Sequence, residues 1–171
     1  MKLYTSMLVL GFLCGCAGMQ APPPEPPNAA IHDNLIVPRV RIGEAALGMS
    51  EANLLEWLGT PSQTIRGGGS DVWYEYSSKG LGIGFTAGRA RTVQTTTSSH
   101  RTADGISVGT PELKVRATWG QPTMSADFHE LNGYDYCFAN DLKVGVDTRS
   151  STVRFIQISA ERCYARRGGS R

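Results

Sequence analysis

A segment of fourteen residues occurs twice in the chain, and this repeat constrains the fold more than any other feature of the sequence. The first copy runs from Gly48 to Pro61 and the second from Gly109 to Pro122, 61 residues later, and the two align without a gap. A repeat of this period usually marks a supersecondary unit that cannot bury its apolar face alone. The sequence therefore predicts two similar halves that share a core.

Each copy predicts a short helix with both ends marked. At the start of each helix, a hydroxyl side chain can accept a hydrogen bond from an unpaired backbone N–H group, and a glutamate is stabilised by the positive end of the helix dipole. At the end, a glycine with left-handed backbone followed by a proline stops the helix. These residues are Ser50, Glu51 and Gly59 in the first copy and Thr110, Glu112 and Gly120 in the second. Four columns are apolar in both copies and are expected to face the core: Leu47 and Val108, Ala52 and Leu113, Leu54 and Val115, and Leu58 and Trp119.

Strand patterns surround both helices. A leading strand or extended arm precedes each helix, at 35–42 and 101–108, and three antiparallel strands follow it. The three lie near 72–76, 80–85 and 89–94 in the first half and near 133–136, 141–146 and 152–157 in the second, where the offset grows from 61 to 63, as a longer hairpin turn or a β-bulge would produce. We therefore predict an α+β domain, in which two tandem helix-plus-antiparallel-sheet repeats form one sheet with helices packed on one face.

Alternation along the strands assigns residues to the two faces of this sheet. The residues predicted to point inward are Tyr74, Tyr76, Leu81, Ile83, Phe85, Leu142, Val144 and Val146. Those predicted to point outward are Trp73, Glu75, Gly82, Gly84, Lys143 and Gly145, and the matching acidic pair Glu75 and Asp135 is expected to be solvated. Trp73 beside glycines that leave the backbone open would suit an anchor for a protein partner. Alternatively, Trp73 folds over the glycines and only covers them.

The chain begins with the pattern of an export signal. Met1 and Lys2 precede an apolar run from Met7 to Leu13, which is too short to span a membrane. The following Leu13-Cys14-Gly15-Cys16 resembles the bacterial lipobox, which implies lipidation of Cys16 and attachment to the membrane through the N-terminal lipid. The alternative is an ordinary signal peptide with two incidental cysteines. Because Ala17 follows Cys16, the sorting rule of such proteins implies the outer membrane of a Gram-negative cell, facing the periplasm.

The rest of the chain divides by composition. After a signal peptide at 1–15 we predict a lipid anchor and proline-rich tether at 16–34, a first repeat at 35–98, a second repeat at 99–160 and a basic tail at 161–171. The tail is expected to be solvated, or to attract anionic headgroups weakly. The net charge of +2 is too small to argue for a nucleic-acid partner.

Two cysteines remain after processing, Cys137 and Cys163, and export to an oxidising compartment favours a disulfide between them over two free thiols. They form no CxxC motif and no Cys-plus-His metal spacing. The three histidines, His32, His100 and His129, show no HxxxH or HExxH spacing, and the chain has no GxSxG motif. We therefore predict no metal, no cofactor and no enzymatic activity.

The ordered set Gly-Met-Ser, Leu-Gly-Thr-Pro, Trp-Tyr-Glu-Tyr and Gly-Leu-Gly-Ile-Gly-Phe, within residues 48–85, resembles the SmpA/OmlA family of outer-membrane assembly lipoproteins. The duplication, over about 35–160, is similar to the β-lactamase inhibitor protein fold, but this chain has two units where the assembly lipoprotein has one. The resemblance implies a lipid-anchored envelope protein that acts as a protein-interaction module in outer-membrane assembly or integrity. An inhibitor of a periplasmic or extracellular hydrolase is the alternative. The sequence does not identify the protein partner.

Overall fold

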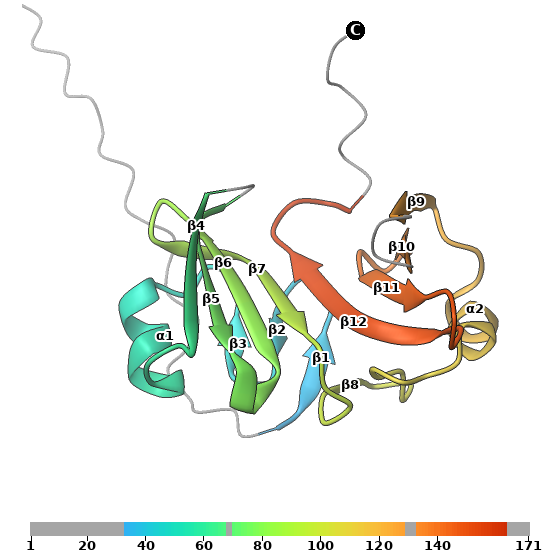
Figure 1. Cartoon of the computed structure of the whole chain (residues 1–171), viewed down its shortest axis with the longest axis horizontal. Helices are drawn as coiled ribbons and strands as arrows, with labels where there is room; N and C mark the ends of the chain where they lie inside the picture. Colours follow the sequence, from blue (N-terminus) through green and yellow to red (C-terminus); the bar gives the residue numbers. More distant parts are fainter. Residues whose placement is uncertain (1–32, 68–69, 129–132, 164–171) are drawn as a thin grey trace, which may run out of the picture.

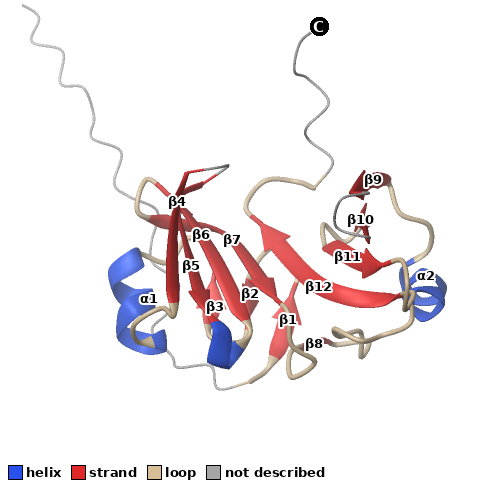
Figure 2. Ribbon diagram, in the orientation of Figure 1, coloured by secondary structure: helices blue, strands red, loops and turns tan. Residues whose placement is uncertain are grey.

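The structure, a computed structural model, describes residues 33–67, 70–128 and 133–163. Strands are the predominant regular structure of this part and are arranged in two sheets (Figures 1 and 2). Its two α-helices are short, α1 at Glu51–Leu58 and α2 at Glu112–Trp119, and a 3-10 helix, η1, spans Ser77–Lys79. The predicted signal peptide, Cys16 and the basic tail beyond Cys163 lie outside the described residues. Among the described helices, none is long and apolar enough to cross a membrane.

The larger sheet has eight antiparallel strands, four from each half of the chain. The first half supplies β4 (Gln63–Gly67), β5 (Ser70–Tyr76), β6 (Leu81–Thr86) and β7 (Arg89–Thr95), and the second supplies β9 (Met124–Phe128), β10 (Gly133–Cys137), β11 (Lys143–Asp147) and β12 (Thr152–Ser159). Their order is β4-β5-β6-β7-β12-β11-β10-β9, so the last strands of the two halves pair, with Val93 opposite Ile158.

The smaller sheet is built from the leading segments of both halves. It has the order β3-β2-β1-β8 and consists of β1 (Leu35–Val37), β2 (Arg41–Ile42), β3 (Ala45–Ala46) and β8 (Arg101–Thr102). β1 and β8 run parallel, with Ile36 opposite Thr102, so the start of the first half is joined to the start of the second. The hydrogen bonds between β1 and β8 satisfy backbone N–H and C=O groups that burial would otherwise leave unpaired.

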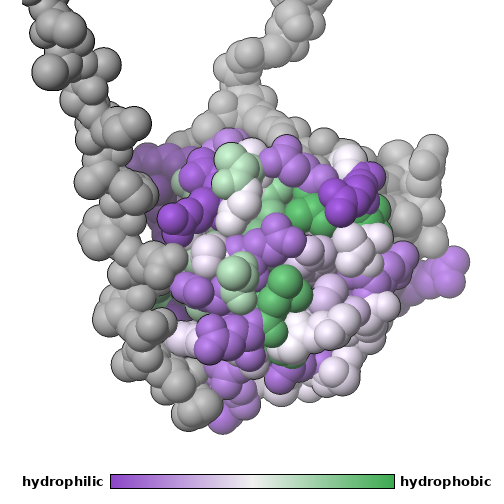
Figure 3. Space-filling model, turned by 90° about the vertical axis from the view of Figure 1, so that its left-hand side faces the viewer, coloured by the Kyte–Doolittle hydropathy of each residue, from purple (hydrophilic) through white to green (hydrophobic). Residues whose placement is uncertain are grey.

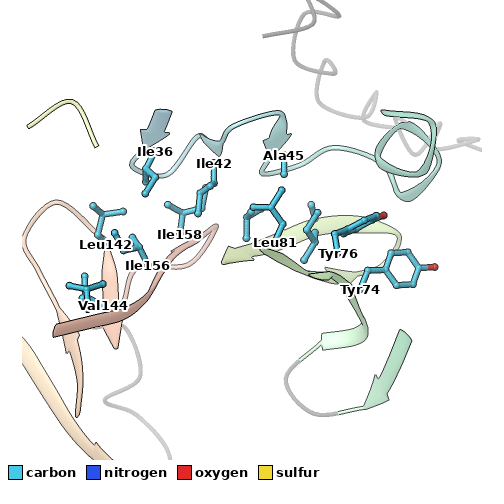
Figure 4. Close-up of a cluster of buried hydrophobic side chains, with 14 of the residues drawn as sticks. Ile36, Ile42, Ala45, Tyr74, Tyr76, Leu81, Leu142, Val144, Ile156 and Ile158 are labelled. Carbon is cyan, nitrogen blue, oxygen red and sulfur yellow. The ribbon is translucent and has the colours of Figure 1, made fainter. Parts of the chain in front are cut away.

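The predicted α+β arrangement, with helices packed on one face of a single sheet, is wrong. The small sheet lies over the middle of the large one: Ile36 and Ile42 point from it toward Ile156 and Ile158 of β12, and Ala45 points toward Leu81 of the large sheet (Figure 4). Element lengths give the physical reason. A helix of eight residues is about 12 Å long, whereas eight strands span about 34 Å. The two helices therefore leave the junction of β7 and β12 uncovered, and the leading strands bury it.

The predicted inward side chains are confirmed as core. Tyr76, Leu81, Ile83, Phe85, Leu142, Val144 and Val146 are all at most 5% exposed, and Tyr74 is 9% exposed. The predicted helical columns are correct only in part. Leu54 and Val115 are buried, but Leu113 is 82% exposed, because so short a helix turns little of its surface toward the core.

The helix ends also differ from the prediction in the second half. Ser50 accepts a hydrogen bond from the backbone N–H of Asn53, as expected of an N-cap. In the second helix Pro111 occupies the N-cap position, and the hydroxyl of Thr110 accepts instead from the N–H of Ser107. This hydrogen bond holds the loop before the helix rather than the helix itself.

The glycines after both helices have positive φ but are not left-handed helical. Gly59 has φ 80° and ψ −161°, and Gly120 has φ 79° and ψ −162°. This region of backbone space is accessible essentially to glycine alone. The repeat of glycine at these positions therefore follows from backbone geometry, and the near-identical angles show that both halves leave their helices in the same way.

The repeated glutamates link the helices to the large sheet. Glu51 accepts a hydrogen bond from the hydroxyl of Tyr74, and this bond raises the Tyr74 pKa above its usual value. In the second half, Glu112 accepts from Nε of Arg116 at 2.7 Å, and the Arg116 guanidinium lies 4.8 Å from the centre of the Tyr136 ring. Each half thus connects the first turn of its helix to a tyrosine of the sheet.

Candidate functional site

The outward face of the large sheet, opposite the small sheet, carries the predicted partner-binding residues. Glu75 pairs with Gly82 and Trp73 with Gly84 across β5 and β6, while Lys143 and Gly145 alternate to the same face on β11. The structure therefore brings the six residues onto one face in two groups. Strands β7 and β12 separate the groups, so that β5 and β11 are about 19 Å apart.

A line of paired positions, mostly polar, joins the two groups. Cross-strand pairing runs from Glu75 to Gly82, Gln94, Gln157 and Lys143, with each residue opposite the next. We call these five positions the polar row. Its four side chains are all half-buried, with a carboxylate at one end, an ammonium at the other and two amides between them. The amides come from β7 and β12, so the row crosses the junction of the two halves.

Trp73 covers Gly82 of the first group instead of standing beside an open backbone. A Cβ atom on Gly82 would lie 2.3 Å from Cζ2 of the indole, and both Gly82 and Gly84 are buried. The expected open floor at Gly82 is therefore wrong, and there the alternative in which Trp73 folds over the glycine describes the geometry. The half-buried indole itself is what this part of the face presents to solvent.

In the second group, Phe155 of β12 packs on a glycine as Trp73 does in the first. A Cβ atom on Gly145 would lie 2.1 Å from Cε1 of its ring. The ring centre lies 5.8 Å from the Lys143 ammonium and 5.3 Å from the centre of the Arg154 guanidinium. Both distances are within the range of cation–π attraction. An aromatic side chain packed on glycine therefore stands near each end of the polar row.

Asp135 lies beneath the two cations of the second group and is 6% exposed, which contradicts the expected solvated carboxylate. Lys143 Nζ lies 2.6 Å from its Oδ2, and Arg154 Nη2 donates to its Oδ1 at 3.2 Å. A bulge opposite Gly145 places Arg154 beside Phe155 on this face. The first half has the equivalent bulge, between Gly84 and Phe85, so the increased repeat offset in β12 comes from the longer turn between β11 and β12. The offset therefore did not identify the partner of the carboxylate.

The predicted disulfide is confirmed. Cys137 and Cys163 are bonded, with 5.7 Å between their Cα atoms, across a separation of 26 residues. Cys137 ends β10 directly opposite Lys143. The bond therefore attaches the segment that follows β12 to the strand beside the second group.

The side of the molecule that carries α1 and β4 shows no comparable surface among its described residues. Figure 3 looks onto the side that carries α1 and β4, where apolar side chains appear as separate spots among polar ones. The exposed large apolar residues of these two elements are Leu55, 36% exposed, and Ile65, 42% exposed. Scattered single residues of this kind are normal for a protein surface.

A polar pocket of about 410 Å³ lies beside η1 and the start of β1. These two elements are at the lower edge of Figure 2. We call this cavity the His100 pocket. Its polar lining includes Asp33, Asn34, Glu44, Ser78, Lys79 and His100, over an apolar part formed by Leu58 and Leu81. Sequence reasoning missed it, because the lining residues come from five separate segments and only the fold brings them together. No set of three His, Cys, Asp or Glu side chains in the described part is placed to hold a metal.

His100 is the most buried polar side chain of this pocket. It is 6% exposed, its Nδ1 lies 2.9 Å from the hydroxyl oxygen of Thr95, and burial lowers its pKa. Gly43, with φ 54°, lies against the other edge of the ring, where a Cβ would be 3.0 Å from Nε2. The ring is thus held between a hydroxyl and a glycine.

We expect this histidine to make the fold sensitive to mild acid. A pKa lower in the folded chain than in the unfolded chain means that the unfolded chain binds the proton first, so the free energy of unfolding should fall as pH drops below about 6.5. Asp33, whose pKa the hydrogen bond with Arg41 lowers to about 2, stays ionised over this range. Urea unfolding between about pH 8 and pH 5 measures the slope, which His100→Asn should reduce. An unchanged slope in that variant would contradict the assignment.

No protein-family model matches the sequence, and the comparison with curated proteins finds no similar sequence. Among solved structures, an extracellular protein containing a SCP domain from Bacillus anthracis is similar with a TM-score of 0.52 at 11% identity, over 68% of this chain and 44% of that one. A cysteine-rich secretory protein from Staphylococcus aureus gives 0.48 at 11% identity, over 67% and 44%. A DUF4309 family protein from Bacillus subtilis gives 0.43 at 15%, over 66% and 78%.

These similarities concern the fold only. The chain spans less than half the length of the first two structures, and the last two similarities are too distant to argue from. At 11% identity the Bacillus anthracis structure shows a shared chain path, not a shared activity. None of these three structures is described as a member of the SmpA/OmlA family or as a β-lactamase inhibitor protein, so those resemblances stay predictions.

Proposed function

We propose that this chain is an exported, lipid-anchored protein of the cell envelope that acts by binding a protein partner rather than by catalysis. The partner meets the outward face along the polar row. The disulfide supports export, because such bonds persist in oxidising compartments. The similar Bacillus anthracis protein is extracellular by its name, which agrees with this location. The lipobox-like sequence and Ala17 support an anchor in the outer membrane.

The observation that carries the proposal is the fixed arrangement of large side chains around the polar row. Trp73 rests on Gly82, and Phe155 rests on Gly145 between two cations. Tryptophan and arginine are enriched among the residues that dominate binding energy. Because these side chains are already packed, a partner that contacts them would order little that is not ordered before binding. The ends of the row also differ in charge, which would fix the orientation of the partner.

Replacing Trp73 by alanine should weaken binding of the partner by about 30-fold or more, the effect of losing about 2 kcal/mol at a hot spot. A photo-reactive side chain at position 157 would first capture the partner in intact cells, for identification by mass spectrometry. Affinity is then measured with the purified partner. Leu113→Ala serves as the control, since Leu113 is 82% exposed on α2, and it should bind like the wild type.

The same experiment separates the alternative function. An inhibitor of a hydrolase would be expected to use the hairpin that connects β4 and β5, at one edge of the sheet, where every residue of β4 is exposed. Crosslinks to a hydrolase from position 65, with none from position 157, would favour the inhibitor. Unchanged affinity and stability of the Trp73→Ala variant would remove the main support for the polar row as the binding surface.

The lipid anchor is tested separately. Cys16→Ser should move the protein from the membrane fraction to the soluble fraction, because acyl chains contribute about 0.8 kcal/mol per buried CH₂ to membrane binding. Cys14→Ser is the matched control: this residue is removed with the predicted signal peptide, so the variant should stay with the membrane. Membrane fractionation with blotting reads both. If the Cys16→Ser protein still sediments entirely with the envelope, the lipid is not what holds it there.

A further inference from the structure

The His100 pocket is separate from the polar row and has the features of a ligand site. Its volume of about 410 Å³ falls in the usual range of small-molecule pockets, about 300–1,000 Å³. Apolar side chains, Leu58 from α1 and Leu81 from β6, form part of the lining, and polar groups converge around them. Polar groups outnumber the two leucines in this lining, so the pocket suits a small molecule that is itself rich in polar groups.

The polar lining has no excess charge. Asp33 is paired with Arg41 through two contacts of 2.5 and 2.8 Å, so its charge is compensated outside the pocket. The remaining charged residues of the lining are Glu44 and Lys79, which have opposite signs. A phosphate or a carboxylate would meet as much negative as positive charge here, and so would a cation. The lining therefore favours a neutral ligand.

His100 favours a ligand that carries hydroxyl groups. Thr95 occupies Nδ1 of its ring, so Nε2, on the side of Gly43, is the nitrogen that remains for a ligand. Nε2 is a donor in one neutral tautomer and an acceptor in the other. A ligand hydroxyl can accept or donate, and so it matches either tautomer. The hydroxyl of Ser78 and the amide of Asn34 likewise offer both donors and acceptors.

We propose that the His100 pocket binds a neutral sugar. The hydroxyl groups would be bound by His100, Asn34 and Ser78, and the apolar face of the sugar ring would lie on Leu58 and Leu81. The imidazole ring of His100 is already held by Thr95 and Gly43 before a ligand binds, so His100 need not rearrange to bind the sugar. The site lies beside Asp33, at the point where the chain joins the predicted tether, and it is independent of the partner proposed for the outward face.

The test uses three probes that share one ring and differ in charge: glucose, glucose 6-phosphate and glucosamine. Each is titrated into the full mature chain, and chemical shifts are followed by NMR. Glucose should shift the resonances of the His100 ring and of Ser78 in a saturable manner, and it should bind severalfold more tightly than either charged probe. At about 10 mM, a ligand with a Kd of ~1 mM would occupy most sites.

Two variants connect the binding to this pocket. Ser78→Trp places a large side chain on exposed η1 at the pocket and should weaken glucose binding at least tenfold, with the circular dichroism spectrum unchanged. Lys114→Ala, an exposed position on α2, should bind glucose like the wild type. No shift of His100 at about 10 mM glucose, shifts confined to other parts of the chain, tighter binding of the phosphate, or unchanged binding by Ser78→Trp would each overturn the proposal.

Discussion

Replacing Ile42 with alanine should lower the free energy of unfolding by about 2–5 kcal/mol, the usual cost of truncating a fully buried isoleucine. Ile42 is 0% exposed and points from the small sheet toward the junction of the two halves (Figure 4). Its removal would leave a cavity next to Ile158, since neighbouring strands relax only in part. Urea unfolding followed by fluorescence measures the change.

Ile65 provides the matched control for this prediction. It is 42% exposed on β4, at the edge of the large sheet, so Ile65→Ala should cost about 1 kcal/mol or less. The same substitution in two environments separates burial from strand propensity. If both variants lose the same free energy, the small sheet does not cover the large one in solution.

Breaking the disulfide should lower the free energy of unfolding by about 3.5 kcal/mol. The bond closes a loop of 26 residues, and on the chain-entropy model a loop of this length restricts the unfolded chain by roughly that amount. Cys163→Ala and chemically reduced wild type should therefore show similar, lower urea midpoints. Both samples keep the side chain of Cys137, which is 1% exposed, so neither loses buried volume at that position and the change in midpoint reports the loss of the bond.

A wild-type midpoint that does not respond to reductant would contradict this prediction. Breaking the disulfide should also affect the proposed binding surface, because the bond joins the segment after β12 to β10, beside Lys143. In the reduced protein the second group of the outward face loses this covalent connection. Partner affinity should then be compared in oxidised and reduced protein at a urea-free condition where both are folded.

The core and the proposed binding surface are two sides of the same strands. Ile156 and Ile158 of β12 point inward to the small sheet, while Gln157 between them belongs to the polar row on the other side. Gln94 of β7 is its neighbour across the junction. The small sheet, by burying the inward side of this junction, therefore holds together the two halves of the outward row. The alignment of the polar row across the junction therefore depends on the small-sheet residues that cover the inward face.

Several features followed from the sequence because they depend on near neighbours along the chain. The extents of both helices, glycine after each of them, and the inward direction of Tyr74, Tyr76, Leu81 and Val144 follow from periodicity and backbone chemistry. The disulfide followed from the count of cysteines and the predicted export. Such local rules assign a residue to one side of an element, but they do not specify what covers that side.

Tertiary structure alone decided what covers each surface. β1 and β8 pair across 66 residues of sequence to form a second sheet, an outcome that no local pattern contains. Asp135 has the alternation of a solvated residue, yet Lys143 and Arg154 bury it, and Trp73 closes the backbone that Gly82 would otherwise expose. The sequence by itself determined the two helices, three of the four large-sheet strands in each half and the faces of those strands, because these depend on bonds and contacts within a few residues. It did not predict the edge strands β4 and β9, in segments that were expected to be loops. Burial of polar groups, the second sheet and the His100 pocket depend on contacts between distant segments, which only the folded chain brings together.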